Sequence, residues 1–131
     1  MGQKPIEVIL MRQLASYLPI PIFVVDAEGT LLYYNEPAEP LLGRRFDEAG
    51  EMSLEVWSTI FVPTDERGAP LAPDSVPLVV ALRERRPVHR TIGITALNGV
   101  KNRIEVTAFP LESQEAQHLG AVAMFWPSQK P

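Results

Sequence analysis

Few side chains in this 131-residue sequence could do chemistry, and they are widely spaced. The two histidines, His89 and His118, each fall at the start of an expected strand, and no cluster of carboxylates or imidazoles has a metal-binding spacing. The sequence has no cysteine, which excludes disulfides, thiolate metal sites and cysteine nucleophiles. We therefore predict that the protein has no metal site.

The acidic residues include one close pair, Asp26 and Glu28, which general acid–base catalysis could use. Both lie in the turn sequence 26–29, where a carboxylate more often bonds to backbone N–H groups. No nucleophile elbow, zinc-protease motif or glycine-rich phosphate loop is present, so we predict no catalytic residue. The alternative is a small cone-shaped α+β enzyme of the isomerase type, which would need Asp26 or Glu105 inside an apolar cavity.

The composition is that of one globular domain, with 46% hydrophobic and 21% charged residues. A net charge of −4 argues against a nucleic-acid surface, and the basic cluster at residues 83–90 suits the C-terminal end of a helix. No apolar run approaches the roughly 20 residues of a membrane span, so we expect no membrane partner. The absence of cysteine fits a reducing compartment, which favours a cytoplasmic location.

A β-hairpin followed by a short helix is the strongest structural signal. Two β-rich runs, residues 22–25 and 30–34, flank the turn sequence 26–29, which ends in glycine. Asn35 follows the second run, and its side-chain oxygen is expected to cap a helix that Gly43 ends. Pro40 keeps that helix short.

Helices are expected in the middle of the chain and strands at its end. After a charged loop at 44–51, a short helix spans 54–61, and a longer one spans 75–86 with Asp74 or Ser75 as its cap. Strands at 88–97 and 101–111 flank the hairpin turn Asn98-Gly99. The last strand, 118–126, is apolar on both faces and should be central in its sheet. This order predicts an α+β fold with one antiparallel sheet and helices over one face.

Residues 5–18 predict an amphipathic flanking helix, which ends before Pro19. It can pack on the sheet of its own domain or pair with a second copy of the chain, and the sequence leaves both open. The candidate dimer interface comprises apolar residues spaced three or four apart: Ile6, Ile9, Leu10 and Leu14.

This order of elements resembles the PAS domain family over residues 18–126. The resemblance rests on blocks that occur in family order: V-D-x-x-G at 25–29, N-x-x-A-x-x-L-L-G at 35–43, D-x-x-G-x-P-L at 65–71, P-L-x-x-A-L at 77–82, P-V at 87–88, I-E-V-x-A-x-P-L at 104–111 and G-A-V at 120–122. It implies a five-stranded antiparallel sheet whose short helices form a concave wall over one face. We expect the flanking helix at 1–18, the PAS domain at 19–127 and a tail at 128–131.

The resemblance implies a non-catalytic sensory or protein-interaction module. It further implies a homodimer through the first helix and the outer sheet face, and a kinase or transcription-regulator effector that is separate or removed. Many family members continue from the last strand into a signalling helix. Here Pro127 discourages that continuation.

The resemblance also brings a set of cofactors, which the residues disfavour. A photoactive flavin or a covalent chromophore would need a cysteine, and the helix at 75–86 has no histidine to serve as an axial haem ligand. We therefore expect no cofactor. An apolar pocket remains, with this candidate lining: Tyr34, Trp57, Phe61, Leu78, Leu82, Ile92, Ile94, Phe109 and Phe125. Plain core packing is the favoured interpretation of these residues, and a small apolar metabolite held without a covalent link is the alternative.

Overall fold

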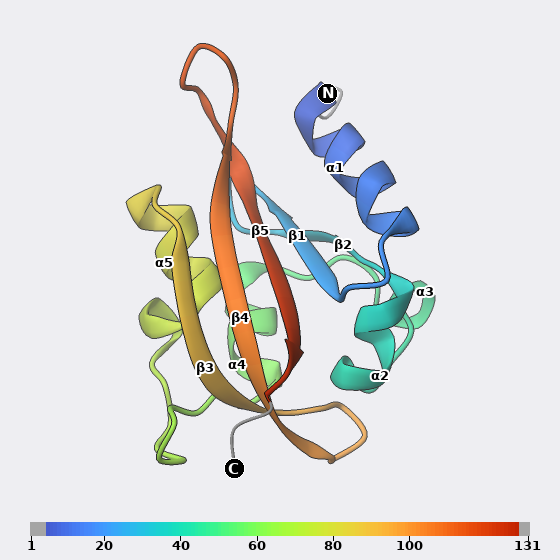
Figure 1. Cartoon of the computed structure of the whole chain (residues 1–131), viewed down its shortest axis with the longest axis vertical. Coiled ribbons are helices and arrows are strands. Elements are labelled where there is room, and N and C mark those ends of the chain that lie inside the picture. Colours follow the sequence, from blue (N-terminus) through green and yellow to red (C-terminus); the bar gives the residue numbers. More distant parts are fainter. Residues whose placement is uncertain (1–4, 129–131) are drawn as a thin grey trace.

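In the computed structural model, residues 5–128 are described, and their strands form one antiparallel sheet (Figure 1). The sheet has five strands in the order β2-β1-β5-β4-β3, each antiparallel to its neighbours. The strands are β1 (Ile22–Asp26), β2 (Leu31–Tyr34), β3 (Val88–Thr95), β4 (Lys101–Glu112) and β5 (His118–Pro127). The predicted fold class, including the central position of the last strand, is confirmed. Residues 1–4 of the flanking segment and 129–131 of the predicted tail lie outside the described residues.

Helices pack on both faces of this sheet (Figure 1). The wall on one face is built from short elements: η1 (Glu36–Ala38), α2 (Glu39–Leu42), α3 (Phe46–Ala49), α4 (Leu54–Ile60), η2 (Pro73–Ser75) and α5 (Pro77–Glu84). The N-terminal helix α1 (Ile6–Tyr17), blue in Figure 1, lies on the opposite face. The sheet therefore has two hydrophobic cores, a large one under the wall and a smaller one under α1.

Two local predictions in the wall are wrong. The charged segment 44–51 is not a plain loop, because it contains the helical turn α3, whose first N–H, that of Phe46, donates to the Glu39 carboxylate at 3.0 Å. This bond satisfies one of the free amides that a helix start leaves. Neither Asp74 nor Ser75 caps α5, since both lie in η2 and α5 begins at Pro77.

The turn between β1 and β2 is held by its first residue. One oxygen of the Asp26 carboxylate accepts the N–H groups of Glu28 at 2.9 Å and Thr30 at 3.0 Å. Gly29 follows with φ +89°, and a Cβ at this position would lie 2.5 Å from a Leu54 methyl group. The structure confirms that Asp26 is a turn residue bonded to the backbone.

Asn35 has a different role from the one predicted, because its side chain makes no hydrogen bond to the helix that follows. It is 1% exposed, and its Nδ2 donates to the carbonyl oxygens of Ala15 at 2.9 Å and Ile20 at 2.8 Å. Its Oδ1 accepts the N–H of Ile22 at 2.9 Å. The amide thus joins the end of α1, the start of β1 and the end of β2.

Helix α1 packs on the sheet through residues outside the candidate dimer interface. Val8 is 2% exposed and Ala15 is fully buried, and they lie over Leu32, Val24 and other apolar residues of the face opposite the wall. The four residues of the candidate dimer interface are exposed instead. Within the described residues, no helix is long and apolar enough to cross a membrane.

We predict that Asn35→Ala lowers the free energy of unfolding by about 2–4 kcal/mol. The substitution removes three hydrogen bonds and leaves the buried Ile22 N–H without its partner, while the Ala15 carbonyl oxygen keeps its bond from Leu18. Urea denaturation followed by circular dichroism measures the change.

Asn98→Ala is the matched control, because Asn98 is exposed and its side chain accepts one 3.2 Å bond from Val100. It should cost about 0.5 kcal/mol or less. Equal losses for the two variants would contradict the role given to Asn35.

Candidate functional site

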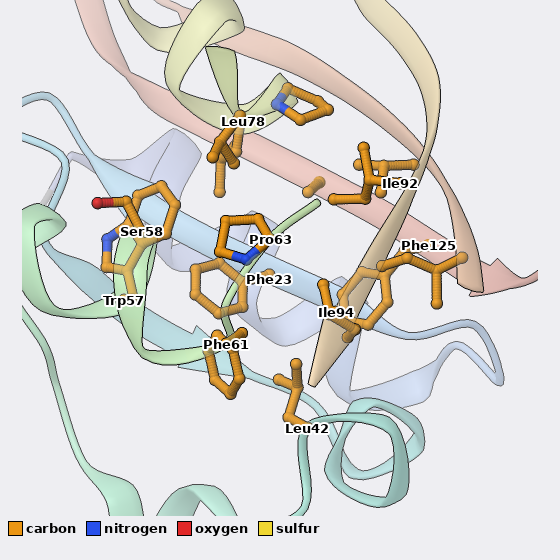
Figure 2. Close-up of a pocket in the computed structure, with 15 residues that line it drawn as sticks. Phe23, Leu42, Trp57, Ser58, Phe61, Pro63, Leu78, Ile92, Ile94 and Phe125 are labelled. Atoms are coloured by element: carbon orange, nitrogen blue, oxygen red, sulfur yellow. The ribbon is translucent and has the colours of Figure 1, made fainter. Parts of the chain in front are cut away.

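An apolar cavity lies between the wall and the sheet, with a volume of about 80 Å³ (Figure 2). Strands β1, β3, β4 and β5 form its floor, and α4, α5 and the segment after α4 form its sides. The lining is Phe23, Leu42, Trp57, Ser58, Phe61, Pro63, Val76, Pro77, Leu78, Ile92, Ile94, Ile104, Val106, Ala123 and Phe125. Its walls are almost wholly hydrocarbon, so contact with a guest would be dispersive and hydrophobic.

The structure brings most of the predicted pocket residues together. Those that line the cavity are Trp57, Phe61, Leu78, Ile92, Ile94 and Phe125. Tyr34 and Leu82 are buried in the same core but do not line the cavity. Phe109 lies on the opposite face of the sheet, with the residues under α1. Whether the cavity takes a ligand stays a prediction.

Several lining residues were missing from the sequence-based set. Ile104, Val106 and Ala108 are spaced two apart along β4 and therefore share the face under the wall. This spacing is visible in the sequence and already indicated that Ile104 and Val106 face the cavity. Phe23 is the residue of β1 that pairs with Tyr34, which places the two on one face. Leu42, Pro63 and Val76 come from short helices and loops, where no periodicity exists to signal them.

Ser58 gives the cavity wall one unpaired polar atom. The residue is 2% exposed, and its Oγ has no hydrogen-bond partner among the described residues. In the view of Figure 2 this oxygen points away from the other lining side chains. The other polar atom nearby, Nε1 of Trp57, donates to the carbonyl oxygen of Gly29 at 2.7 Å. No ionisable side chain is among the described residues that line the cavity.

Tyr34 stacks on the lining residue Phe23, with ring centroids 6.1 Å apart. Its hydroxyl group donates to the carbonyl oxygen of Arg44 at 2.7 Å, which ties β2 to the segment before α3. Burial, with a smaller contribution from the Glu39 carboxylate, raises the pKa of Tyr34 to about 12. The phenol therefore remains a neutral hydrogen-bond donor at physiological pH.

Neither histidine lies at the cavity. His89 lies on the other sheet face, where its Nδ1 is 2.8 Å from Thr107 Oγ1 and its Nε2 is 3.6 Å from Glu105. His118 begins β5, and its pKa is lowered by partial burial and by the nearby Arg85. The described residues contain no group of three histidines or carboxylates that could hold a metal ion.

A second candidate surface is the outward side of α1. The residues predicted as a dimer interface are exposed in the single chain, Ile6 by 66%, Ile9 by 49%, Leu10 by 54% and Leu14 by 50%. Tyr17, exposed by 77%, extends the row by one turn. We call these five residues the α1 stripe. A row of large apolar side chains in water is typical of an interaction surface.

A five-stranded antiparallel sheet with a helical wall over an apolar cavity defines the class of this protein as the PAS fold. The family described as PAS fold matches the sequence over residues 16–128, and the chain belongs to this family. The family resemblance and the fold inferred from it are confirmed. A search of curated protein sequences finds no match.

Solved structures with this fold include PAS and LOV domains of bacterial proteins. The PAS domain of BvgS from Bordetella pertussis is 18% identical, with a TM-score of 0.63 over 95% of this chain and 87% of that chain. The PAS domain of nitrogen regulation protein NR(II) from Vibrio parahaemolyticus is 17% identical, with a TM-score of 0.61 over 91% and 98%. The LOV protein of Rhodobacter sphaeroides is 12% identical, with a TM-score of 0.72 over 96% and 70%. At these identities the likeness shows the fold alone.

A flavin is one of the cofactors that the family resemblance implies. The residues around this cavity do not fit it. A volume of about 80 Å³ is far below the roughly 300–1,000 Å³ of pockets that enclose drug-sized ligands. The ring system of a flavin also needs several hydrogen-bond partners, whereas the lining has Ser58 and a Trp57 N–H that is already bonded to Gly29.

We predict that Ser58→Ala raises the free energy of unfolding by about 1 kcal/mol. It removes a buried hydroxyl group that has no partner and places a better helix former in α4. Chemical denaturation of both proteins measures the difference.

Thr59→Ala is the control in the same helix, because Thr59 is exposed and its hydroxyl group bonds to Glu55 of the preceding turn. It should change stability by less than about 0.5 kcal/mol. Destabilisation by Ser58→Ala would mean that this hydroxyl group has a partner in solution.

Proposed function

We propose that this PAS domain is a non-catalytic sensory and protein-interaction module that forms a homodimer through the α1 stripe. The single observation that carries the proposal is that α1 is apolar on two sides. One side is buried on the sheet through Val8 and Ala15, while the other exposes Leu10 and Leu14. A second copy offers the same surface. In a two-fold symmetric dimer the α1 stripes of the two copies would pack against each other and both would be buried.

The outer sheet face extends this surface. Beside α1, the partly exposed residues Phe109, Met124 and Trp126 follow one another across β4 and β5 on the α1 side. Stable dimers bury about 800 Å² on each partner, more than a single helix row supplies. The stripe and this strip lie on the same side of the sheet, so one partner could contact both.

The described residues support a module without catalysis. The two carboxylates that an isomerase-like enzyme could use both lie away from the cavity. Asp26 is bonded within its turn, and Glu105 lies beside His89 on the other face. A general base needs a titratable group in reach of its substrate, and the lining offers none.

The signal would pass to a separate effector. Relatives with this fold include the nitrogen regulation protein NR(II) and a blue-light activated histidine kinase from Erythrobacter litoralis, whose LOV domain is 20% identical with a TM-score of 0.65. We infer an effector of the kinase or transcription-regulator type, reached through α1 or through the outer sheet face.

We predict that the purified chain is a dimer by light scattering and that the double variant Leu10→Glu/Leu14→Glu is a monomer. Two carboxylates in the middle of the stripe would have to be buried unpaired in the dimer. Both positions are about half-exposed in the single chain, so the fold itself should persist.

Ser16→Glu is the control, because it adds a charge to the same helix at an exposed position outside the stripe and should leave the dimer intact. Truncation before Leu18 is a poorer test, since it would uncover the buried sheet residues Ile22, Val24 and Val122. A wild-type chain that stays monomeric at high concentration would overturn the dimer proposal.

A second function, binding of a small apolar metabolite, rests on the cavity itself. An apolar cavity of about 150 Å³ in another protein holds benzene, so about 80 Å³ leaves room for a few heavy atoms at most. A larger guest would require the wall to move outward. We favour the cavity as a packing feature of the core.

We predict that native mass spectrometry of the purified protein gives the mass of the chain or its dimer with no added ligand, and that the protein has no visible absorption. The reason is the small volume and the lack of polar anchors. A reproducible bound mass that is lost on unfolding would instead support the metabolite alternative.

A further inference from the structure

A run of aromatic rings passes around the edge of the sheet at β2. Tyr33 and Tyr34 are consecutive in this edge strand, so their side chains lie on opposite faces. Tyr34 belongs to the core under the wall, and Tyr33 packs with the residues under α1. Elsewhere the backbone of the sheet separates these two cores.

Phe46 of α3 contacts both tyrosines from beyond the edge. Its ring centroid is 5.5 Å from that of Tyr33 with planes at 72°, and 5.3 Å from that of Tyr34 with planes at 78°. Both are edge-to-face contacts, the geometry that aromatic pairs favour. One side chain thus joins the two faces of the sheet.

The run continues in both directions. On the wall side Tyr34 stacks on Phe23 at 6.1 Å, and Phe23 meets Trp57 edge-to-face at 5.3 Å, which brings the series to the cavity. On the other side the Arg12 guanidinium group lies 4.8 Å from the centre of the Tyr33 ring, which brings it to α1. A guanidinium group over a ring is an attractive contact.

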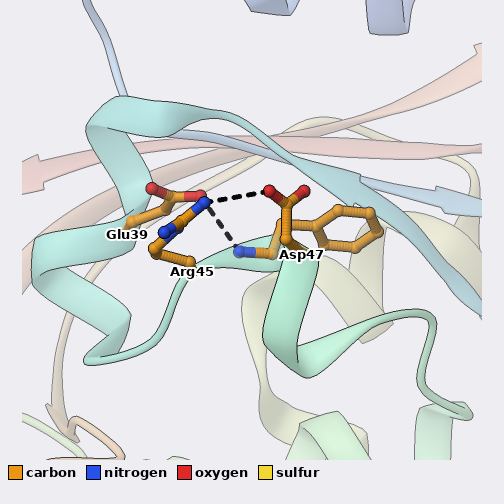
Figure 3. Close-up of polar contacts among 4 residues, drawn as sticks. Glu39, Arg45 and Asp47 are labelled. Carbon is orange, nitrogen blue, oxygen red and sulfur yellow. Dashed lines mark hydrogen bonds and ion pairs between the residues drawn. The ribbon is translucent and has the colours of Figure 1, made fainter.

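The helical turn that carries Phe46 is held by a few polar contacts. Glu39 accepts the Phe46 N–H at 3.0 Å, and Arg45 pairs with Asp47 at 3.1 Å, as Figure 3 shows. The Tyr34 hydroxyl group bonds to the Arg44 carbonyl oxygen just before the turn. A shift of α3 would therefore change the contacts of Phe46 with both tyrosine rings at once.

We propose that Phe46 couples the cavity to the seating of α1, so that a change in the cavity wall alters how firmly α1 binds the sheet. This inference rests on the proposed function, because it gives the α1 dimer surface a route from the sensing core. The coupling is reciprocal: a change at α1 must also reach Trp57.

The first experiment measures hydrogen exchange in the full chain. Phe46→Leu should speed exchange of the α1 amides about fivefold relative to those of β5, the effect of losing about one aromatic pair. Leu71→Ala is the matched control, since Leu71 packs against the same core but is not among the residues that line the cavity. This control should change the exchange rates of the α1 and β5 amides by the same factor. An unchanged ratio in Phe46→Leu would overturn the proposal.

The second experiment tests coupling in the opposite direction, through the indole N–H cross-peak of Trp57 in a nitrogen-15 NMR spectrum. Arg12→Ala removes the cation from the exposed end of the series and should shift this peak in the wild type but not in Phe46→Leu. Gln13→Ala, exposed on the same helix, should not shift it. A shift that persists without Phe46, or no shift at all, contradicts the coupling.

Two further measurements keep the result decisive. If Phe46→Leu fails to fold, Tyr33→Leu cuts the series on the α1 side and should likewise abolish the shift of the Trp57 peak that Arg12→Ala causes. Light scattering on the same samples separates this inference from the proposed dimer, because the coupling acts within one chain. A monomer with an intact coupling refutes the dimer alone, and a dimer without it refutes the coupling alone.

Discussion

The buried amide of Asn35 is the constraint on which the arrangement of this domain depends. It bonds to Ala15, Ile20 and Ile22, so the end of α1 and the start of β1 are fixed to the end of β2. Because each of these backbone groups is buried or half-buried, water cannot replace the amide without cost. The direction in which α1 crosses the sheet follows from this contact together with the packing of Ala15.

Helix α1 also covers the second apolar face of the sheet. Strand β5 is apolar on both faces, which the sequence shows plainly, and such a strand needs a cover on each side. The sequence therefore predicts that something covers the second face. It does not predict which side of α1 does so, because Ile6, Leu10 and Leu14 form a stronger apolar row than Val8 and Ala15. The small Ala15 lets the helix approach closely, and close approach outweighs side-chain size.

The sequence predicted six of the fifteen residues that line the cavity, and the errors have identifiable causes. The β4 residues that face the wall are the even-numbered Ile104, Val106 and Ala108, so the odd-numbered Phe109 must face α1. A stricter use of the alternation would have excluded it. Asn35 is a different case, since the local rule for helix caps competed with three partners that only the tertiary structure brings together. No local pattern could have revealed them.

The geometry of a sheet limits where its two faces can communicate. Side chains on opposite faces are separated by a continuous hydrogen-bonded backbone, so direct contact between the two cores requires an end or an edge. Here the edge strand β2 is the shortest of the five, and a register shift at Val24 and Val25 places both Leu32 and Tyr33 under α1. Phe46 then needs to reach only one strand width to touch Tyr33 and Tyr34.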